Sequence, residues 1–141
     1  TAFSIKDLDI KHYGNVRFQI WDFAGEDRFK FLLPGYTKGA HGAIICFNIT
    51  DFTTFEEVAE WINIIRNSVE EVPILLVGTK YDLNNHQVSE KLVREYVSDV
   101  LCLGFAYCSS KTNENVWEVF NFISKWMIHV ANQNREASAA I

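Results

Sequence analysis

The sequence is poor in proline, in cysteine and in long apolar runs, and each shortage excludes a class of protein. Two prolines and three cysteines occur among 141 residues, which excludes collagen-like repeats and disulfide-rich scaffolds. The cysteines are odd in number and form no CxxC pair, so we expect reduced thiols that are buried as small hydrophobic side chains. The longest apolar clusters, residues 43–47 and 74–77, have the length of strands and are too short to span a membrane.

Clusters of positive charge and metal-binding motifs are also missing. Thirteen basic against eighteen acidic side chains give a formal charge of −5, with no run of Lys or Arg, so we expect no binding to nucleic acid. The four histidines show no HExxH spacing, and the sequence contains no GxSxG elbow, so we expect neither a zinc site nor a hydrolase triad. The 48% apolar and 22% charged residues are typical of one globular domain with a packed core.

The order of hydrophobic patterns predicts an α/β fold. Residues 3–10 and 16–22 alternate apolar and polar around Gly14-Asn15, which predicts an antiparallel hairpin, and one short helix is expected within residues 24–40. Beyond them, strands are expected at 42–49, 74–78 and 103–108, and helices at 53–68, 89–97 and 116–130. Such alternation predicts right-handed crossovers and a mostly parallel sheet with helices on both faces.

Local signals set the expected helix ends. Thr53 with Glu56 forms a capping box at the start of the first long helix, and Ser89 can cap the second. Residues 131–141 have little apolar surface to pack, so we expect a flexible tail there.

Three polar segments follow the ends of predicted strands, where ligands bind in open α/β sheets. They are DFAG at 22–25, TKYD at 79–82 and SSK at 109–111. In this order and spacing they resemble the DxxG, NKxD and SAK motifs of Ras-superfamily small GTPases, and EDRF at 26–29 and YTKGA at 36–40 resemble the Rab branch most closely. The resemblance covers roughly residues 3–130 and implies a P-loop NTPase-type G domain that binds GTP or GDP and Mg²⁺.

The guanine end of such a site can be interpreted from its residues. A carboxylate on a rigid loop can accept both the ring N–H and the exocyclic amine of guanine, so we expect Asp82 to choose the base. The resemblance implies that the stem of Lys80 lies along the base and that the Ser110 N–H donates to the guanine carbonyl. Thr79 stands where the family usually has Asn, which removes one bracing amide. The residues expected at the nucleotide are Gly25, Thr79, Lys80, Asp82, Leu83, Ser109, Ser110 and Lys111.

At the phosphate end the resemblance implies a magnesium site and a switch. Asp22 would reach Mg²⁺ through a water molecule, and Thr1 is a second candidate ligand whose register is ambiguous. The Gly25 N–H would contact the γ-phosphate. Loss of this contact on GTP hydrolysis would release the segment that follows Gly25. Glu26 occupies the catalytic position where the family has Gln. A carboxylate there would be repelled by the γ-phosphate, at a cost of about 4 kcal/mol for unit charges 4 Å apart at an effective dielectric near 20. Glu26 would therefore protonate, turn away or slow hydrolysis. The alternative is that Glu26 is an acidic residue in the first turn of a helix and faces solvent.

Aromatic residues mark an expected effector surface. Trp21 and Tyr36, with Phe3, match aromatic positions that face effectors in Rab-like proteins, and Arg28 and Phe29 belong to the same expected surface. The alternative is ordinary core packing. The partners implied are effectors, exchange factors and GTPase-activating proteins.

The phosphate-binding loop of the family is missing from these residues. No GxxxxGK[ST] occurs, so we expect residues 1–130 to form a partial G domain, from the end of switch I onward, that lacks the first strand, the P-loop and the first helix. In the family's strand order the first strand would lie between the strands at 17–22 and 42–48. Its absence would split the sheet through its centre.

Two functions stay open at this point. The first is a GTP/GDP switch that hydrolyses GTP and recruits effectors, expected for the complete protein. The second is a scaffold that binds nucleotide weakly or not at all and works through protein contacts; a further possibility is that another chain supplies the missing strand. No cysteine follows Cys108 in these residues, so we expect no prenyl anchor, and we expect a cytoplasmic protein that reaches membranes through partners.

Overall fold

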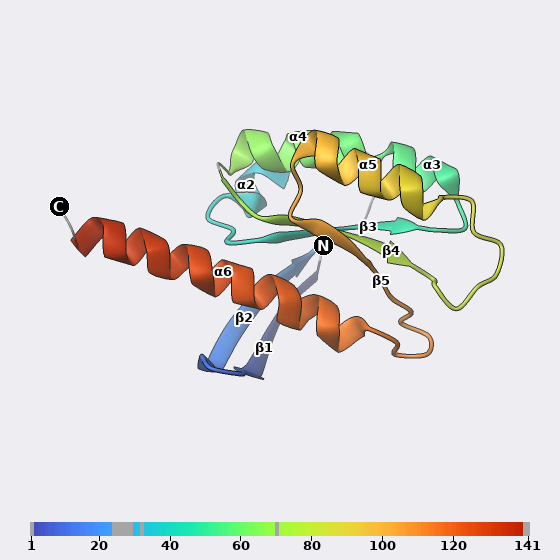
Figure 1. The fold of residues 1–141 in the computed structure, drawn as a ribbon. Coiled ribbons are helices and arrows are strands. Elements are labelled where there is room, and N and C mark those ends of the chain that lie inside the picture. Colours follow the sequence, from blue (N-terminus) through green and yellow to red (C-terminus); the bar gives the residue numbers. More distant parts are fainter. Residues whose placement is uncertain (1, 24–29, 32, 70, 140–141) are drawn as a thin grey trace.

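The computed structural model describes residues 2–23, 30–31, 33–69 and 71–139. Thr1, Gly25, Glu26, Arg28 and Phe29, all named above as candidate site residues, lie outside these ranges. The elements follow one another as β1 Ala2–Ile10, β2 Gly14–Asp22, α2 Leu33–Thr37, β3 Ala43–Asn48, α3 Phe52–Glu56, α4 Val58–Ser68, β4 Ile74–Thr79, α5 Glu90–Val100, β5 Gly104–Tyr107 and α6 Val116–Ala139 (Figure 1).

A parallel three-stranded sheet forms the centre of the molecule. Its order is β3-β4-β5, with Cys46 opposite Val77 and Gly78 opposite Tyr107. Helices α3, α4 and α5 cover one face of this sheet and α6 covers the other (Figure 1). The predicted α/β fold with helices on both faces is therefore confirmed.

The central strand β4 supplies both hydrophobic cores, because successive side chains of a strand point to opposite faces. Leu76 packs with Phe47 and Val93 beneath the α3–α5 layer, whereas Leu75 and Val77 pack against α6. Five of the six residues of β4 are buried. The sequence of a strand that is buried on both faces is a continuous apolar run. The run ILLV at 74–77 predicted a strand for this reason.

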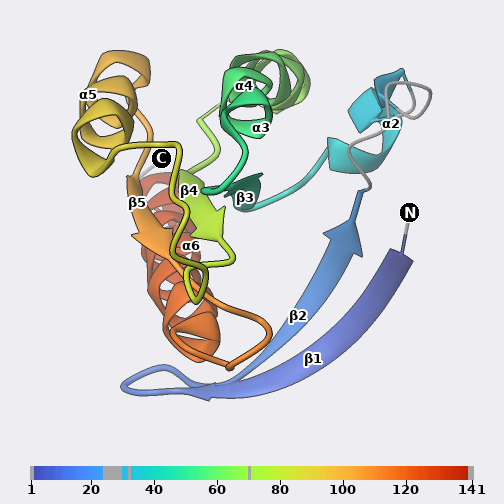
Figure 2. The ribbon, with the colours of Figure 1, turned by 90° about the vertical axis from the view of Figure 1, so that its right-hand side faces the viewer.

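The hairpin is a separate sheet. β1 and β2 pair antiparallel, with Phe3 opposite Trp21 and Ile10 opposite Gly14, and the sheet orders join neither of them to β3. Figure 2 shows the hairpin diverging from the parallel strands. The expected split of the sheet between β2 and β3 is thus confirmed. One consequence is that β2 has no buried residue along its whole length.

The start of the first long helix differs from the prediction. Asp51, and not Thr53, is the N-cap: its backbone is extended and its carboxylate accepts a hydrogen bond from the Thr53 N–H at 3.1 Å. The helix therefore begins at Phe52, and Glu57 separates α3 from α4. Thr54 is engaged elsewhere, because its hydroxyl oxygen accepts from the Asn48 N–H at 2.9 Å. The cap of α5 at Ser89 is confirmed by its bond from the Leu92 N–H.

Two further expectations need correction. Helix α6 continues to Ala139, because residues 131–139 are mostly good helix formers that extend a helix already nucleated on the core; the flexibility of the tail stays a prediction. Cys46 is exposed and Cys102 is partly exposed, so only Cys108 is buried as expected. Cys46 is exposed because β3 is an edge strand of its sheet.

Within the described ranges, no helix is both long and apolar enough to cross a membrane.

Candidate nucleotide-binding site

A cavity of about 430 Å³ opens where β4 and β5 end. This volume lies within the range of about 300–1,000 Å³ that is typical of small-molecule sites. Two segments far apart in the sequence form it, because the carboxyl ends of parallel neighbours meet at one edge of the sheet. The residues that line it are Thr79, Lys80, Asp82, Leu83, Ser110 and Lys111.

The two loops of this cavity are joined by hydrogen bonds. The Ser109 hydroxyl donates to Asp82 Oδ1 at 2.8 Å and accepts from the Thr112 N–H at 3.2 Å. Ser109 is completely buried. The Tyr81 N–H donates to the Cys108 carbonyl at 3.1 Å. The carboxylate of Asp82 is therefore held in one orientation by the loop after the next strand, and six of the expected nucleotide residues line the cavity while Ser109 lies behind it.

The loop after β4 is shaped by its own residues. The Thr79 hydroxyl donates to the Phe47 carbonyl at 3.1 Å, so threonine at this position braces the loop to β3. Lys80 has a φ of 61°, in the left-handed region that is rare for a residue with a side chain. The Leu83 N–H donates to the Lys80 carbonyl at 3.0 Å and closes the turn. Positive φ also occurs at ordinary turns and helix ends of this chain, such as His12 and Leu101, so the backbone of Lys80 is compatible with a functional loop without identifying one.

Sequence reasoning missed the residue that braces the loop after β5. The Asn115 side-chain amide donates to the Tyr107 carbonyl at 2.7 Å, and the Ser109 N–H donates to the Glu114 carbonyl at 3.0 Å. Asn113 and Asn115 both have positive φ. The two asparagines could have indicated this turn from the sequence alone, because asparagine adopts the left-handed backbone region more readily than most residues. The Asn-Glu-Asn run after SSK indicates such a turn.

The phosphate end is represented by Asp22 alone, since the other candidates there lie outside the described residues. Asp22 is the exposed last residue of β2. Cys46 is exposed at the sheet edge, yet desolvation by the protein atoms around its thiol, followed by the charges of Cys108 and Asp22, raises the pKa of this thiol to about 11. No cluster of three or more His, Cys, Asp or Glu side chains suited to a metal ion occurs in the described part of the chain. One carboxylate is compatible with Mg²⁺, which keeps several waters and takes ligands from phosphates.

The aromatic residues expected at an effector surface form a connected row. The rings of Phe3 and Trp21 are 4.6 Å apart between centroids, and those of Trp21 and Tyr36 are 5.6 Å apart. Each of the three side chains is 43–47% exposed, which disagrees with the alternative of core packing. Phe23, which sequence reasoning did not single out, extends the row with a centroid distance of 6.0 Å to Tyr36. Its position next to Trp21 and Asp22 was the available signal.

The fold and the cavity together define an α/β domain with a candidate ligand site at the carboxyl edge of its parallel strands. Residues 1–129 match the Ras family. The chain belongs to the Ras family of small GTPases, in its Rab branch. Membership in this family implies guanine nucleotide binding and GTPase activity at the level of the family.

Similar proteins come from several kingdoms. The GTP-binding protein ypt1 of Schizosaccharomyces pombe is 38% identical over 125 residues, which are 88% of this chain and 62% of that protein. The Ras-related protein RABD2b of Arabidopsis thaliana is 39% identical over 106 residues, 74% of this chain and 52% of its own length. The Ras-related protein Rab-1A of Dictyostelium discoideum is 36% identical over 119 residues, which are 84% of this chain and 58% of that protein. The chain thus spans between half and two thirds of the length of these relatives.

Proposed function

We propose that this chain binds a guanine base in the cavity between the loops after β4 and β5, with Asp82 as the residue that selects the base. The observation that carries the proposal is the Asp82 carboxylate, which lines a cavity of about 430 Å³ and is oriented by the buried Ser109 hydroxyl. The relative named GTP-binding protein ypt1 supports the same ligand class.

The chemistry of the proposed recognition follows from donors and acceptors. Ser109 occupies one lone pair of Asp82 Oδ1, and a carboxylate has about four acceptor positions, so others stay available for the ring N–H and the amine of guanine. Adenine offers no donor pair in that arrangement and would leave a desolvated carboxylate unpaired. Such a bidentate contact discriminates between bases by about 1–3 kcal/mol. Lys80 and Ser110, which also line the cavity, would contact the base through an aliphatic stem and a backbone N–H.

For a complete protein, we infer a GTP/GDP switch that hydrolyses GTP. Asp22 would hold Mg²⁺ through water, with Thr1 as a further candidate ligand. Gly25 would sense the γ-phosphate, and Glu26 would take the position of the water-orienting residue. The exposed row of Phe3, Trp21 and Tyr36 supports a surface for effectors, with Arg28 and Phe29 as further candidates. Exchange factors, activating proteins, a cytoplasmic location and attachment to membranes through partners belong to the same proposal.

The base end can be tested without the phosphate end. GDP and ADP are titrated separately into the 141-residue chain, and affinities are measured by calorimetry. We expect GDP to bind at least about fivefold more tightly than ADP, because the bidentate contact contributes about 1–3 kcal/mol. Asp82→Ala should remove this preference, whereas Asp99→Ala, which removes an equal charge from an exposed position on α5, should preserve it. Equal affinity of the unaltered chain for the two nucleotides contradicts the proposal.

A second candidate function is a scaffold that works through protein contacts. Glu26 and Thr79, which stand where the family usually has Gln and Asn, favour it, because both depart from the family's nucleotide-binding pattern. Under this alternative neither GDP nor GTP would bind to the chain at millimolar concentration, although the aromatic row would still bind partners.

A further inference from the structure

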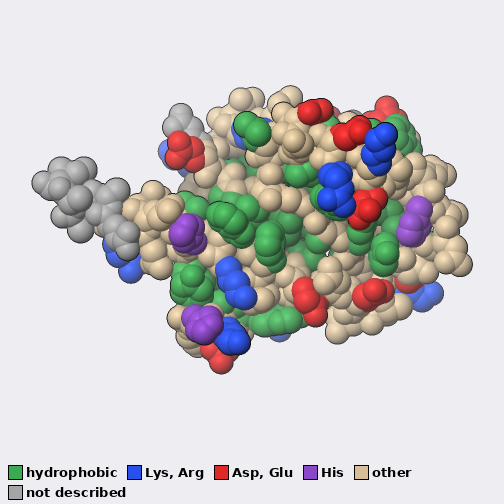
Figure 3. Space-filling model, in the orientation of Figure 1, with side chains coloured by type: hydrophobic (Ala, Val, Ile, Leu, Met, Phe, Trp, Pro, Cys, Tyr) green, Lys and Arg blue, Asp and Glu red, His purple; other side chains and the backbone are tan. Residues whose placement is uncertain are grey.

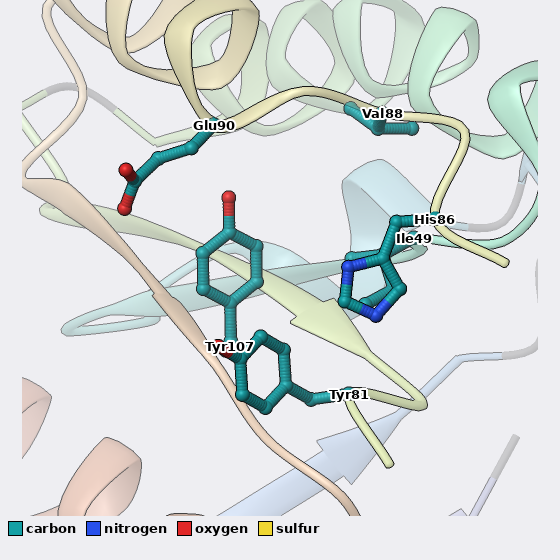
Figure 4. Close-up of a pocket in the computed structure, with 6 residues that line it drawn as sticks. All are labelled: Ile49, Tyr81, His86, Val88, Glu90 and Tyr107. Carbon is teal, nitrogen blue, oxygen red and sulfur yellow. The ribbon is translucent and has the colours of Figure 1, made fainter. Parts of the chain in front are cut away.

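A second cavity, of about 190 Å³, lies next to the loop that follows β4 (Figure 4). In Figure 4 the rings of Tyr81, Tyr107 and His86 lie around it with Ile49 and Val88, and the Glu90 side chain extends past the Tyr107 hydroxyl, on the side away from His86. The rings of Tyr81 and Tyr107 are stacked, with 5.2 Å between centroids and an interplanar angle of 15°. The His86 ring lies 5.6 Å from that of Tyr81. The residues that line the cavity are Ile49, Tyr81, His86, Val88, Glu90 and Tyr107.

The chemistry of this lining favours a cation that has a flat apolar face. The faces of aromatic rings attract cations electrostatically, and buried Ile49 and Val88 provide an apolar base. Glu90 is the first residue of α5, where a carboxylate interacts favourably with the positive end of the helix dipole. The full charge of Glu90 exceeds the fractional charge of the helix end, so the rim of the cavity is negative. The charge of Glu90 also contributes to the raised pKa of the Tyr107 hydroxyl, after the larger effect of burial.

The neighbouring cation leaves this carboxylate available. Arg94 Nη2 approaches Glu90 Oε1 to 3.6 Å, which is longer than a hydrogen bond, and both side chains are more than 60% exposed. The Arg94 guanidinium lies over the Phe105 ring, 5.3 Å from its centroid. Among the described residues no hydrogen bond to the Glu90 carboxylate is formed. An incoming cation would therefore compete with this exposed ion pair and not with a hydrogen bond.

We propose that this cavity binds the guanidinium group of an arginine side chain presented by a partner protein. A guanidinium is planar, so it can stack on a tyrosine ring and donate to a carboxylate at the same time. The cavity has less than half the volume of the proposed base pocket, which suits one side-chain head group. The overall charge of −5 favours a basic partner, and on the face seen in Figure 3 Lys, Arg, Asp and Glu side chains are interspersed around hydrophobic ones without a large basic patch.

This site is separate from the proposed base pocket although both share one loop. Lys80 and Asp82 line the base pocket, while Tyr81 between them lines the arginine pocket. A side chain that binds against Tyr81 therefore occupies a cavity whose lining shares no residue with the base pocket. The proposal does not depend on nucleotide binding, and its test uses no nucleotide.

The test uses small analogues of the side chain as probes. N-acetyl-arginine methylamide, its citrulline counterpart and N-acetyl-lysine methylamide are titrated into the isotope-labelled chain, and amide and tyrosine ring resonances are followed by NMR. We expect millimolar binding of the arginine probe, with the largest shifts at Tyr81, Tyr107 and Glu90. The citrulline probe has nearly the same shape without the charge and should bind at least about fivefold more weakly. Equal binding of citrulline, or of lysine, would overturn the assignment to arginine.

Exposed variants sharpen the test without disturbing the core. Glu90→Gln should weaken binding of the arginine probe by about three- to fivefold, the effect of an exposed ion pair. Arg94→Gln should strengthen it by about twofold, because it removes the competing cation from Glu90. Glu95→Gln is the matched control, since this α5 carboxylate pairs with Lys91 and does not line the cavity. An unchanged affinity in Glu90→Gln, or a loss of affinity in Arg94→Gln, contradicts the proposal.

Discussion

At the residue scale, one buried hydroxyl connects the loops of the candidate site. Ser109 donates to Asp82 and accepts from the Thr112 N–H. Both bonds are lost together if the hydroxyl is removed, which leaves a backbone donor without its partner and a carboxylate free to rotate. Proximity of SSK and TKYD at one edge of the sheet was predictable from the motifs. The direct bond between Ser109 and Asp82 was not, because it depends on the side-chain rotamers that the packed loops allow.

Substitution of this serine should affect stability and binding together. We expect Ser109→Ala to lower the free energy of unfolding by about 1–3 kcal/mol, the usual result of leaving a buried polar group unpaired. GDP affinity should also fall, because Asp82 is no longer oriented. Urea denaturation and calorimetry measure the two effects. Ser98→Ala is the control: Ser98 is exposed on α5 and does not line the cavity, so both quantities should stay close to those of the unaltered chain.

At the scale of secondary-structure elements, periodicity predicted the strands and long helices but not the start of α3. The capping-box pattern at Thr53 was outcompeted by Asp51, whose carboxylate accepts the Thr53 N–H two residues later in the chain. Both residues are common N-caps. The choice was made by the end of β3, where Asn48 bonds to the Thr54 hydroxyl and so directs the chain into a helix from Phe52.

The two possible caps can be separated by alanine substitution. Asp51→Ala should lower the free energy of unfolding by about 0.5–2 kcal/mol, the typical cost of losing an N-cap. Thr53→Ala should change it by only a few tenths of a kcal/mol, because Thr53 lies inside the helix and alanine is the better helix former. Chemical denaturation of both variants is the measurement. A larger decrease in the free energy of unfolding for Thr53→Ala than for Asp51→Ala would show that Thr53 is the N-cap.

The close packing around Gly78 in strand β4 leads to a further prediction at the scale of elements. A Cβ atom on Gly78 would lie 2.6 Å from Ile49 Cγ2 and 2.6 Å from Tyr107 Cδ1. Gly78→Ala should therefore destabilise the protein by about 1–3 kcal/mol through overpacking. Gly104→Ala is the matched control in a neighbouring strand, since no atom lies within 4 Å of its added Cβ. Thermal unfolding compares them, and equal midpoints would show that β4 and its neighbours move apart at no cost.

At the scale of the whole molecule, the division into two sheets is the dominant feature. The parallel sheet has a core on each face, whereas β2 of the hairpin has no buried residue. The hairpin register is secured by its turn and by cross-strand contacts such as the exposed Asp7–Arg17 pair, with 2.8 Å between Arg17 Nε and Asp7 Oδ1. Arg17 holds the pKa of the Asp7 carboxyl below its usual value.

This division predicts unequal stability along the chain. Amide hydrogen exchange should be faster in β2 than in β4, because regions with few buried apolar contacts open at lower free energy. Exchange measured by mass spectrometry on peptides covering 14–22 and 74–79 tests this. Equal protection of the two strands would contradict the picture of a hairpin stabilised mainly by its own pairing.

By itself, the sequence determined the fold class, the hairpin, the order of strands and helices and the family motifs at 79–82 and 109–111, because these depend on periodicity and on short runs of residues. The tertiary structure decided the rest. It selected Asp51 as the cap, exposed Cys46 at a sheet edge and oriented Asp82 through a serine 27 positions away. It also placed Tyr81 beside Tyr107 and Glu90 around a second cavity. These features arise from contacts between segments distant in sequence, which only the packed arrangement of the chain creates.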